Sequence, residues 1–114
     1  MSKTNNMEAQ IKAGRLAAGM SFNEKVWALT AQIPAGKVKT YGDIARKLNT
    51  RAYRAVGNAL NRNPYAPVVP CHRVVGSTGE LTGFAHGLPA KGRMLEAEGV
   101  SVTKGRVDLS RHRV

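Results

Sequence analysis

Cysteine is almost absent from this sequence, in which Cys71 is the one cysteine among 114 residues. A single cysteine excludes an internal disulfide, so the composition gives no indication of an oxidising compartment. Apolar runs long enough to span a membrane are also absent, and the first ten residues are too polar for a secretory signal. We therefore expect a cytoplasmic protein, or a nuclear one in a cell with a nucleus, that has no membrane partner.

Acidic residues are scarce as well. Seven Asp and Glu stand against eighteen Lys and Arg, a formal net charge of +11 at pH 7. Between residues 37 and 73, eight cations accompany a single anion, Asp43. This excess favours a polyanionic partner, because each neutralised phosphate releases a condensed counterion. Charge alone does not separate DNA from RNA or acidic lipid, and a solvated basic surface has the same composition.

The length allows one domain, which we place at residues 21–114 and expect to be monomeric. Residues 1–20 contain Gly14 and Gly19 and few periodic apolar positions, so they are interpreted as a flexible N-terminal tail. The last residues, 103–114, are basic and are expected to add phosphate contacts. His86 and His112 are interpreted as surface residues.

Two capping boxes mark the beginnings of helices. Ser21 with Glu24, and Thr40 with Asp43, have the spacing at which the two side chains satisfy free amides at a helix start. Apolar residues at three- and four-residue steps predict helices over residues 21–33, 40–48 and 51–61. Two short helices in which the second is rich in arginine are typical of a helix-turn-helix. Periodicity alone leaves any helical hairpin as an alternative.

Prolines stiffen the chain between residues 64 and 70, immediately before Cys71. Residues 73–81 resemble a small β-hairpin, and residues 88–98 have helical spacing. Residues 100–109 predict a short closing ribbon. The expected fold is therefore mainly α with a small β-hairpin, a single domain like a winged helix-turn-helix.

The surroundings of Cys71 indicate chemistry. A lone cysteine is most often a small buried hydrophobe, but cationic neighbours populate the thiolate, which is the nucleophilic form. His72 is a candidate general base, and a carboxylate such as Glu98 is a candidate to orient the imidazole. No metal or cofactor is expected, because one cysteine and three scattered histidines lack the spacing of metal ligands.

Several ordered blocks resemble one family. The run Pro70-Cys71-His72-Arg73-Val74-Val75 closely resembles the active-site motif of the O6-alkylguanine-DNA alkyltransferases. Residues 39–45 resemble the first helix of the family's helix-turn-helix, and residues 54–60 resemble its recognition helix. Asn63-Pro64 resembles the hinge before the active-site loop. Residues 83–87 resemble the loop over the base pocket, and residues 95–99 the helix end that carries the family's glutamate. Most members of this family have two domains, and the resemblance is to the C-terminal one.

The resemblance implies a single-turnover methylated-DNA–protein-cysteine methyltransferase that flips O6-alkylguanine out of duplex DNA. The alkyl group would pass irreversibly to Cys71. The reacting atom of a paired base is enclosed in the stack, so this chemistry requires extrusion. The implied catalytic residues are Cys71, His72 as base, Glu98 to orient it, and Asn63 at the hinge. The implied DNA contacts are Thr40, Tyr41, Arg54, Ala55, Gly57 and Arg73. The implied base pocket is Tyr41, Leu60, Val74, Phe84 and Ala85.

Three other functions stay open. Alkyltransferase-like proteins resemble this domain and bind alkylated guanine without transfer, but they lack the acceptor cysteine. A nonspecific architectural DNA binder would need the helix-turn-helix without Cys71 and His72. A cysteine hydrolase would need an oxyanion hole, which no residue pattern reveals. Ala85 also departs from the family, which usually has serine at this position.

Overall fold

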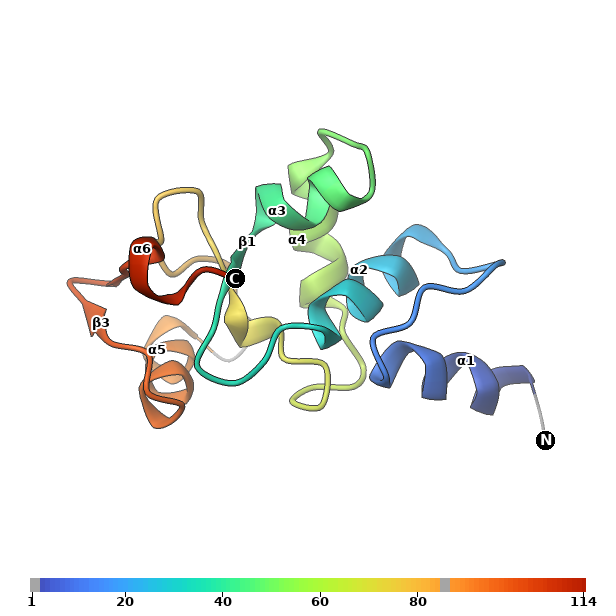
Figure 1. Cartoon of the computed structure of the whole chain (residues 1–114), viewed down its shortest axis with the longest axis horizontal. Coiled ribbons are helices and arrows are strands. Elements are labelled where there is room, and N and C mark those ends of the chain that lie inside the picture. The colour runs from blue at the N-terminus through green and yellow to red at the C-terminus, as the bar shows by residue number, and fades with distance from the viewer. Residues whose placement is uncertain (1–2, 85–86) are drawn as a thin grey trace.

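The computed structural model describes residues 3–84 and 87–114. It is elongated, with principal extents of 45 × 28 × 22 Å. Helices α2, α3 and α4 lie in the middle, α1 lies at one end, and α5 and α6 lie toward the other (Figure 1). The helices are α1 (Lys3–Lys12), α2 (Phe22–Ala31), α3 (Tyr41–Lys47), α4 (Tyr53–Asn61), α5 (Leu88–Ala97) and α6 (Leu109–His112), with a 3-10 turn at Cys71–Arg73. The strands are β1 (Lys39–Thr40), β2 (Val74–Val75), β3 (Val102–Thr103) and β4 (Arg106–Val107).

Both predicted capping boxes are present. The Ser21 hydroxyl accepts from the amide of Glu24, and the Glu24 carboxylate accepts from the amide of Ser21. Thr40 and Asp43 make the same reciprocal pair at the start of α3. The expectation of a mostly helical chain with small sheets is confirmed, with helices slightly shorter than the predicted ranges. Among the described helices, none is long and apolar enough to cross a membrane.

The hairpin expected at residues 73–81 is wrong. The chain turns there, and Gly76 donates to the carbonyl of Glu80 over 2.8 Å, but β2 pairs in parallel with β1 instead. Val74 and Val75 are both fully buried, and successive strand residues face opposite sides. Val74 packs with α2, α3 and α4, whereas Val75 packs with the cluster beside α5. A buried position between two cores therefore outweighs local hairpin formation. The antiparallel pair in the described chain is β3 with β4, where the closing ribbon is predicted.

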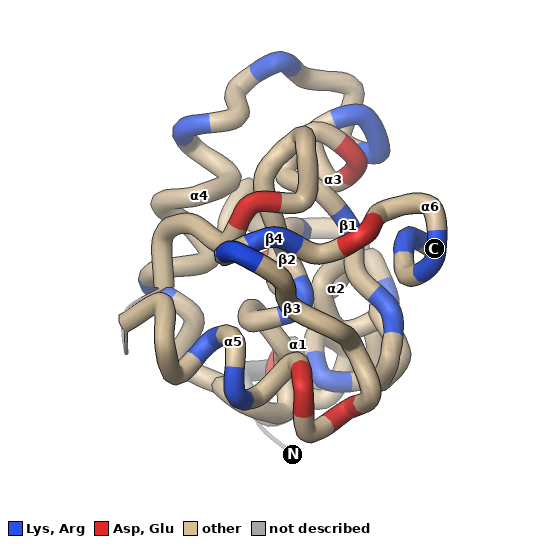
Figure 2. Tube along the Cα trace, turned by 90° about the vertical axis from the view of Figure 1, so that its left-hand side faces the viewer, with Lys and Arg blue, Asp and Glu red and all other residues tan. Residues whose placement is uncertain are grey.

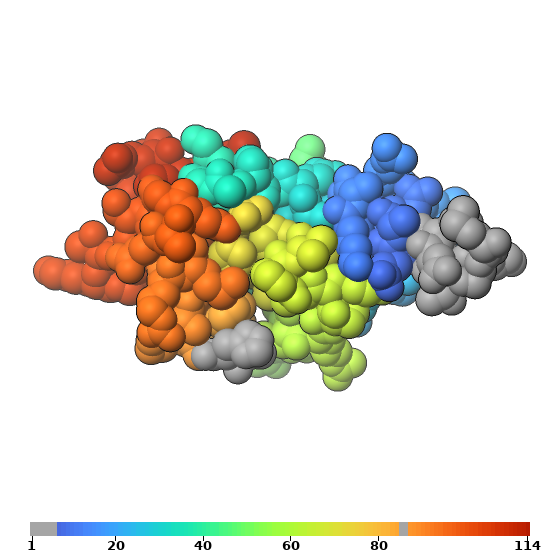
Figure 3. Space-filling view, turned by 90° about the horizontal axis from the view of Figure 1, so that it is seen from below, coloured from blue at the N-terminus to red at the C-terminus, as the bar shows by residue number. Residues whose placement is uncertain are grey.

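The flexible tail expected at residues 1–20 differs from the structure. Residues 3–12 form α1, and both Ile11 and Met20 are buried in a third apolar cluster. This cluster also contains Val69, from the segment that leads to Cys71. Figure 3 shows the N-terminal segment lying against that part of the chain. Contacts distant in sequence order this segment, so its weak local periodicity did not reveal it.

Ile11→Ala is expected to lower the free energy of unfolding by about 2–5 kcal/mol, the cost of a cavity at a fully buried site. Urea denaturation at unchanged slope measures this change. Leu16→Ala is the matched control, because Leu16 lies in the same segment but is 50% exposed, and it should change stability by less than about 0.5 kcal/mol. Equal effects of the two substitutions would show that α1 is not anchored.

The C-terminal segment returns to β1. The amide of Val38 donates to the carbonyl of His112 (2.9 Å), and the amide of Val114 donates to the carbonyl of Val38 (3.1 Å). The expectation that His112 lies on the surface is wrong, because the residue is only 8% exposed. His86 lies outside the described residues.

Candidate functional site

Cys71 begins the 3-10 turn that follows Pro70, and its amide donates to the carbonyl of Val69 over 2.9 Å. The side chain is half-buried where two hollows meet. One hollow is lined by Tyr41, Leu60, Asn61, Asn63, Ala66, Gly83 and Phe84 together with Cys71. The other has a volume of about 140 Å³ and includes His72 and Met94. The thiol is therefore accessible from a partly enclosed space rather than packed in the core.

His72 and Glu98 are brought together from 26 residues apart. Nε2 of His72 lies 3.0 Å from Oε2 of Glu98, which is the C-cap residue of α5. The carboxylate accepts, so Nε2 carries the proton and Nδ1 is left as the acceptor. The His72 side chain is 4% exposed, which holds the ring in one orientation. This arrangement has the base and orienting carboxylate that activation of a nucleophile needs.

Burial sets the charge state of His72, and hydrogen bonds set that of Glu98. Desolvation lowers the pKa of His72, and attraction to Glu98 only partly offsets it, while Arg73 and Lys91 lower it further. Burial raises the pKa of Glu98, but hydrogen bonds from Arg73 and His72 outweigh it, and the net pKa is lowered. At neutral pH the imidazole is therefore neutral and the carboxylate ionised, which is the state a general base requires.

The family resemblance implies a DNA contact for Arg73, but the structure pairs this side chain with Glu98. Its Nε donates to Oε1 of Glu98 (2.9 Å) and its Nη2 to Oε2 (2.6 Å), and Nη1 donates to the carbonyl of Ile33 (2.6 Å). The side chain is 17% exposed. A bidentate bond to a carboxylate leaves this guanidinium occupied, so Arg73 holds Glu98 in place rather than facing a partner.

Asn63 connects the end of α4 to the segment before Cys71. Its Nδ2 donates to the carbonyl of Val69 (2.8 Å), and its Oδ1 accepts from the amide of Tyr65 (2.9 Å). Val69 in turn accepts from the amide of Cys71. Asn63 thus fixes both sides of the proline-rich loop, and the hinge position expected of it is consistent with this geometry.

Tyr41 and the buried Lys91 converge on one carbonyl. The Tyr41 hydroxyl donates to the carbonyl of Thr82 (3.0 Å), and Nζ of Lys91 donates to the same oxygen (2.7 Å). Nζ lies 5.8 Å from the ring centre of Tyr41 and 6.0 Å from that of Phe84. Burial lowers the pKa of Lys91 to about 8, and the nearby Cys71 partly opposes this. Lys91 is therefore buried beside Tyr41 and Phe84, two aromatic residues that line the hollow at Cys71.

Sequence reasoning missed Lys91. Its side chain is 1% exposed, although lysine is almost never fully buried without a partner. The signal was available, since Lys91 lies three residues after Leu88 and four before Leu95, on the face of α5 that contains the buried Leu95.

Three further predicted site residues, Leu60, Val74 and Thr40, are buried. Leu60 and Val74 are buried in the central cluster, and Leu60 also lines the hollow at Cys71. Ala85 lies outside the described residues. Thr40 is 4% exposed and its hydroxyl caps α3, so it is not free for the DNA contact that its sequence position predicts. Packing therefore fixes Leu60 and Val74, and the capping hydrogen bond fixes Thr40.

The predicted DNA contacts on helix α4 are exposed or half-buried. Arg54 is exposed, and Ala55 and Gly57 are half-buried. A methyl group added at Gly57 would meet no atom within 4 Å among the described residues outside its own stretch of helix, so tertiary packing there does not require glycine. Lys and Arg continue along α3, the connection to α4 and the start of α4 (Figure 2). In residues 3–84 and 87–114, no three His, Cys, Asp or Glu side chains group as metal ligands would.

Residues 21–100 match the sequence model of the 6-O-methylguanine DNA methyltransferase DNA-binding domain. The chain belongs to this family. A methylated-DNA–protein-cysteine methyltransferase of Methanosarcina mazei is 52% identical over 81 residues, which are 70% of this chain and 51% of that protein. The chain spans about half the length of the curated family members it matches.

Solved structures of the family share the fold. A Mycobacterium tuberculosis OGT in complex with DNA is 38% identical with a TM-score of 0.67, covering 83% of this chain and 65% of that one. Schizosaccharomyces pombe Atl1, in complex with damaged DNA that contains O6-carboxymethylguanine, is 33% identical with a TM-score of 0.72. The latter match covers 82% of this chain and 94% of Atl1.

Proposed function

We propose that this chain removes alkyl groups from O6 of guanine in duplex DNA by transferring them irreversibly to the sulfur of Cys71. The observation that carries the proposal is the half-buried thiol beside the His72–Glu98 pair, in a hollow with the aromatic rings of Tyr41 and Phe84. An aromatic-lined space suits a flipped base, which stacks on such rings. The family membership and the DNA-bound neighbours support this function.

In the proposed reaction, Nδ1 of His72 takes the proton of the thiol through a water molecule. The thiolate attacks the alkyl carbon, and a sulfur–carbon bond forms as the carbon–O6 bond breaks. The bonding electron pair leaves with guanine, which takes up a proton. The product is a thioether, which thiols do not exchange as they do a disulfide. Each molecule therefore repairs one lesion.

We infer that α3 and α4 act as a helix-turn-helix of winged type in a monomer that corresponds to the family's C-terminal domain. Arg54, at the exposed start of α4, is proposed to fill the space that the flipped base leaves. Gly57 and Ala55 are proposed to let the helix approach the DNA closely, which the open space at Gly57 supports. Tyr41, beside the hollow, is proposed to contact the flipped base.

A second candidate is a damage sensor that binds O6-alkylguanine without transfer. The observation that favours it is the match to Atl1, which covers 94% of that chain. The sensor function would leave Cys71 idle, whereas the proposed function modifies it.

Mass spectrometry separates the two functions. After the protein is mixed with duplex DNA carrying O6-methylguanine, one methyl group is expected on the peptide that contains Cys71, in a stoichiometric amount. Cys71→Ala should bind the same duplex and gain no methyl group. Tight binding by the unaltered protein without any adduct would reject the transfer function in favour of the sensor.

A further inference from the structure

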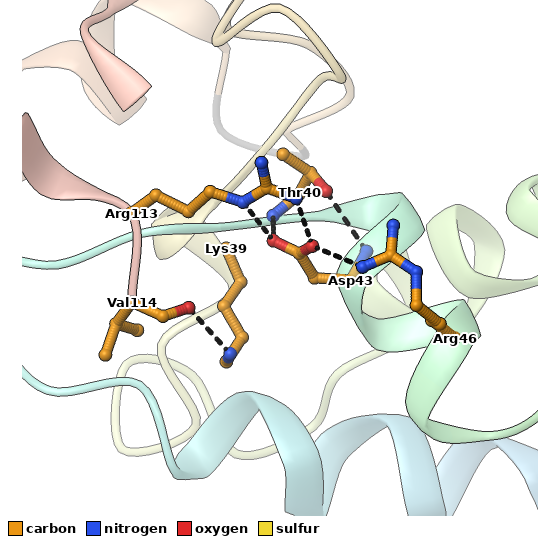
Figure 4. Close-up of polar contacts among 6 residues, drawn as sticks. All are labelled: Lys39, Thr40, Asp43, Arg46, Arg113 and Val114. Carbon is orange, nitrogen blue, oxygen red and sulfur yellow. Dashed lines mark hydrogen bonds and ion pairs between the residues drawn. The ribbon is translucent and has the colours of Figure 1, made fainter. Parts of the chain in front are cut away.

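Two arginines from distant parts of the chain share one buried carboxylate. Arg46 belongs to α3, whereas Arg113 follows α6 and lies beyond the residues that match the family model. They approach Asp43 from opposite sides (Figure 4). Nη1 of Arg46 lies 3.2 Å from Oδ1 of Asp43, and Nε of Arg113 lies 3.1 Å from Oδ2, with its Nη2 also on Oδ1.

The carboxylate neutralises one of these two positive charges and leaves the other. Burial raises the pKa of Asp43, but hydrogen bonds from Arg113 and Thr40 outweigh it and lower the pKa to about 2, so Asp43 stays ionised. The side chains of Arg46 and Arg113 are 74% and 43% exposed. Each guanidinium has N–H groups that Asp43 does not occupy. The pair is therefore held to one carboxylate while it stays exposed and cationic.

Arg46 and Arg113 lie between two hollows of the surface and line both of them. On one side, a groove of about 520 Å³ adds Lys39 and Lys47 to the two arginines. On the other side, a hollow of about 630 Å³ joins both arginines to Tyr41, which also lies beside Cys71. Glu80 is the further acidic residue in the second hollow, and its carboxylate is hydrogen-bonded to Thr78. The two arginines thus lie on a continuous surface that runs from Tyr41, beside the reactive site, to the C-terminal segment.

We propose that Arg46 and Arg113, held by Asp43, form a clamp for a backbone phosphate of the DNA strand that contains the lesion. This inference rests on the proposed function, because it takes duplex DNA as the partner. A planar guanidinium binds phosphate with two parallel hydrogen bonds, and arginines already ordered by a carboxylate lose little further freedom when they do so. The clamp adds a DNA contact outside α4, through a residue of the C-terminal segment.

The test measures the affinity of the full chain for a duplex with one O6-methylguanine over a series of salt concentrations. Arg46→Gln and Arg113→Gln are each expected to weaken binding about three- to tenfold and to reduce the salt slope by about one contact. Lys25→Gln on α2 and Arg93→Gln on α5 remove the same charge at exposed sites elsewhere and serve as matched controls. Arg113→Lys keeps the positive charge but loses the paired N–H groups of the guanidinium. Its affinity for the duplex should therefore lie between that of the unaltered protein and that of Arg113→Gln.

Arg46→Gln is the decisive variant, because a side chain this exposed contributes little to folding. Affinities and salt slopes equal to those of Lys25→Gln and Arg93→Gln would overturn the clamp. Methyl transfer from free O6-methylguanine is expected to be unchanged in Arg46→Gln, since the free base has no phosphate. If the unaltered protein transfers no methyl group from any substrate, the proposed function fails, while the binding comparison still reports on the clamp.

Discussion

Glu98→Gln is expected to lower the rate of methyl transfer to Cys71 by about 10²–10⁴-fold. The ionised carboxylate fixes Nε2–H of His72 and stabilises the imidazolium that forms when His72 takes the thiol proton. Glutamine of the same size retains an acceptor oxygen but supplies no negative charge. Single-turnover kinetics with O6-methylguanine duplex measures the rate. Glu96→Gln, at an exposed site on α5, is the matched control.

The same substitution has a predicted pH signature. In the unaltered protein the pKa of His72 is lowered, so the midpoint of the acidic decline in transfer rate should lie below pH 6.5, the ordinary value for histidine. Glu98 favours the protonated ring, so its neutralisation should lower the pKa of His72 further and move the decline to more acidic pH. In Glu98→Gln the maximal transfer rate would therefore be lower, and the decline of the rate at acidic pH would occur at a lower pH than in the unaltered protein. A variant with a normal plateau would show that His72 does not act as the base through Glu98.

Lys91→Met is expected to raise the free energy of unfolding at pH 7 by about 2–3 kcal/mol. Lys91 is 1% exposed, and burial holds its pKa at about 8 against about 10.5 in the unfolded chain. Between these values the unfolded chain binds more protons, so stability rises with pH across this window. Below pH 8 the full cost of the buried ammonium is present. Methionine removes this cost with a side chain of similar length.

Urea denaturation from pH 7 to 10.5 measures this effect as the difference between the two proteins. The difference should shrink as pH rises above 8. The carbonyl of Thr82 still accepts from the Tyr41 hydroxyl in the variant, so no buried acceptor is left without a donor. Lys25→Met, on the exposed side of α2, should change neither stability nor its pH dependence. A less stable Lys91→Met variant would contradict the prediction.

The buried ammonium of Lys91 is also expected to affect the reactivity of Cys71. The Lys91 ammonium and Cys71 attract each other electrostatically, so we expect the ammonium to stabilise the negative charge that the sulfur carries as it attacks. Lys91→Met should therefore react more slowly at Cys71, by about tenfold, with both methylated duplex and iodoacetamide. A gain in stability together with a loss of reactivity would indicate a residue retained for chemistry. Unchanged reactivity with iodoacetamide would remove Lys91 from this role.

Local features were predictable because short-range physics decides them. The capping boxes at Ser21 and Thr40 depend on side chains three residues apart, and both formed as expected. The proximity of Glu98 to His72 was expected from the family resemblance rather than from spacing, since 26 residues separate them. The N-terminal helix had weak local signals, because Ile11 is stabilised by α2 and by Val69 rather than by its own periodicity.

Local sequence patterns were sufficient to predict the two capped helix starts at Ser21 and Thr40 and the excess of positive charge. They also singled out the cysteine that we propose as the nucleophile and the adjacent histidine that we propose as its base.

Which charged side chains stay exposed depends on the tertiary structure. Both Arg73 and Arg113 bond to a carboxylate, but Arg73, beside Glu98, is 17% exposed, whereas Arg113, beside Asp43, is 43% exposed. The tertiary structure also placed Lys91 in the interior and paired β2 with β1. Helical spacing already indicated that Lys91 lies on the buried face of α5. The partners of Arg73, Arg113 and β2 are distant in sequence, so local patterns do not identify them.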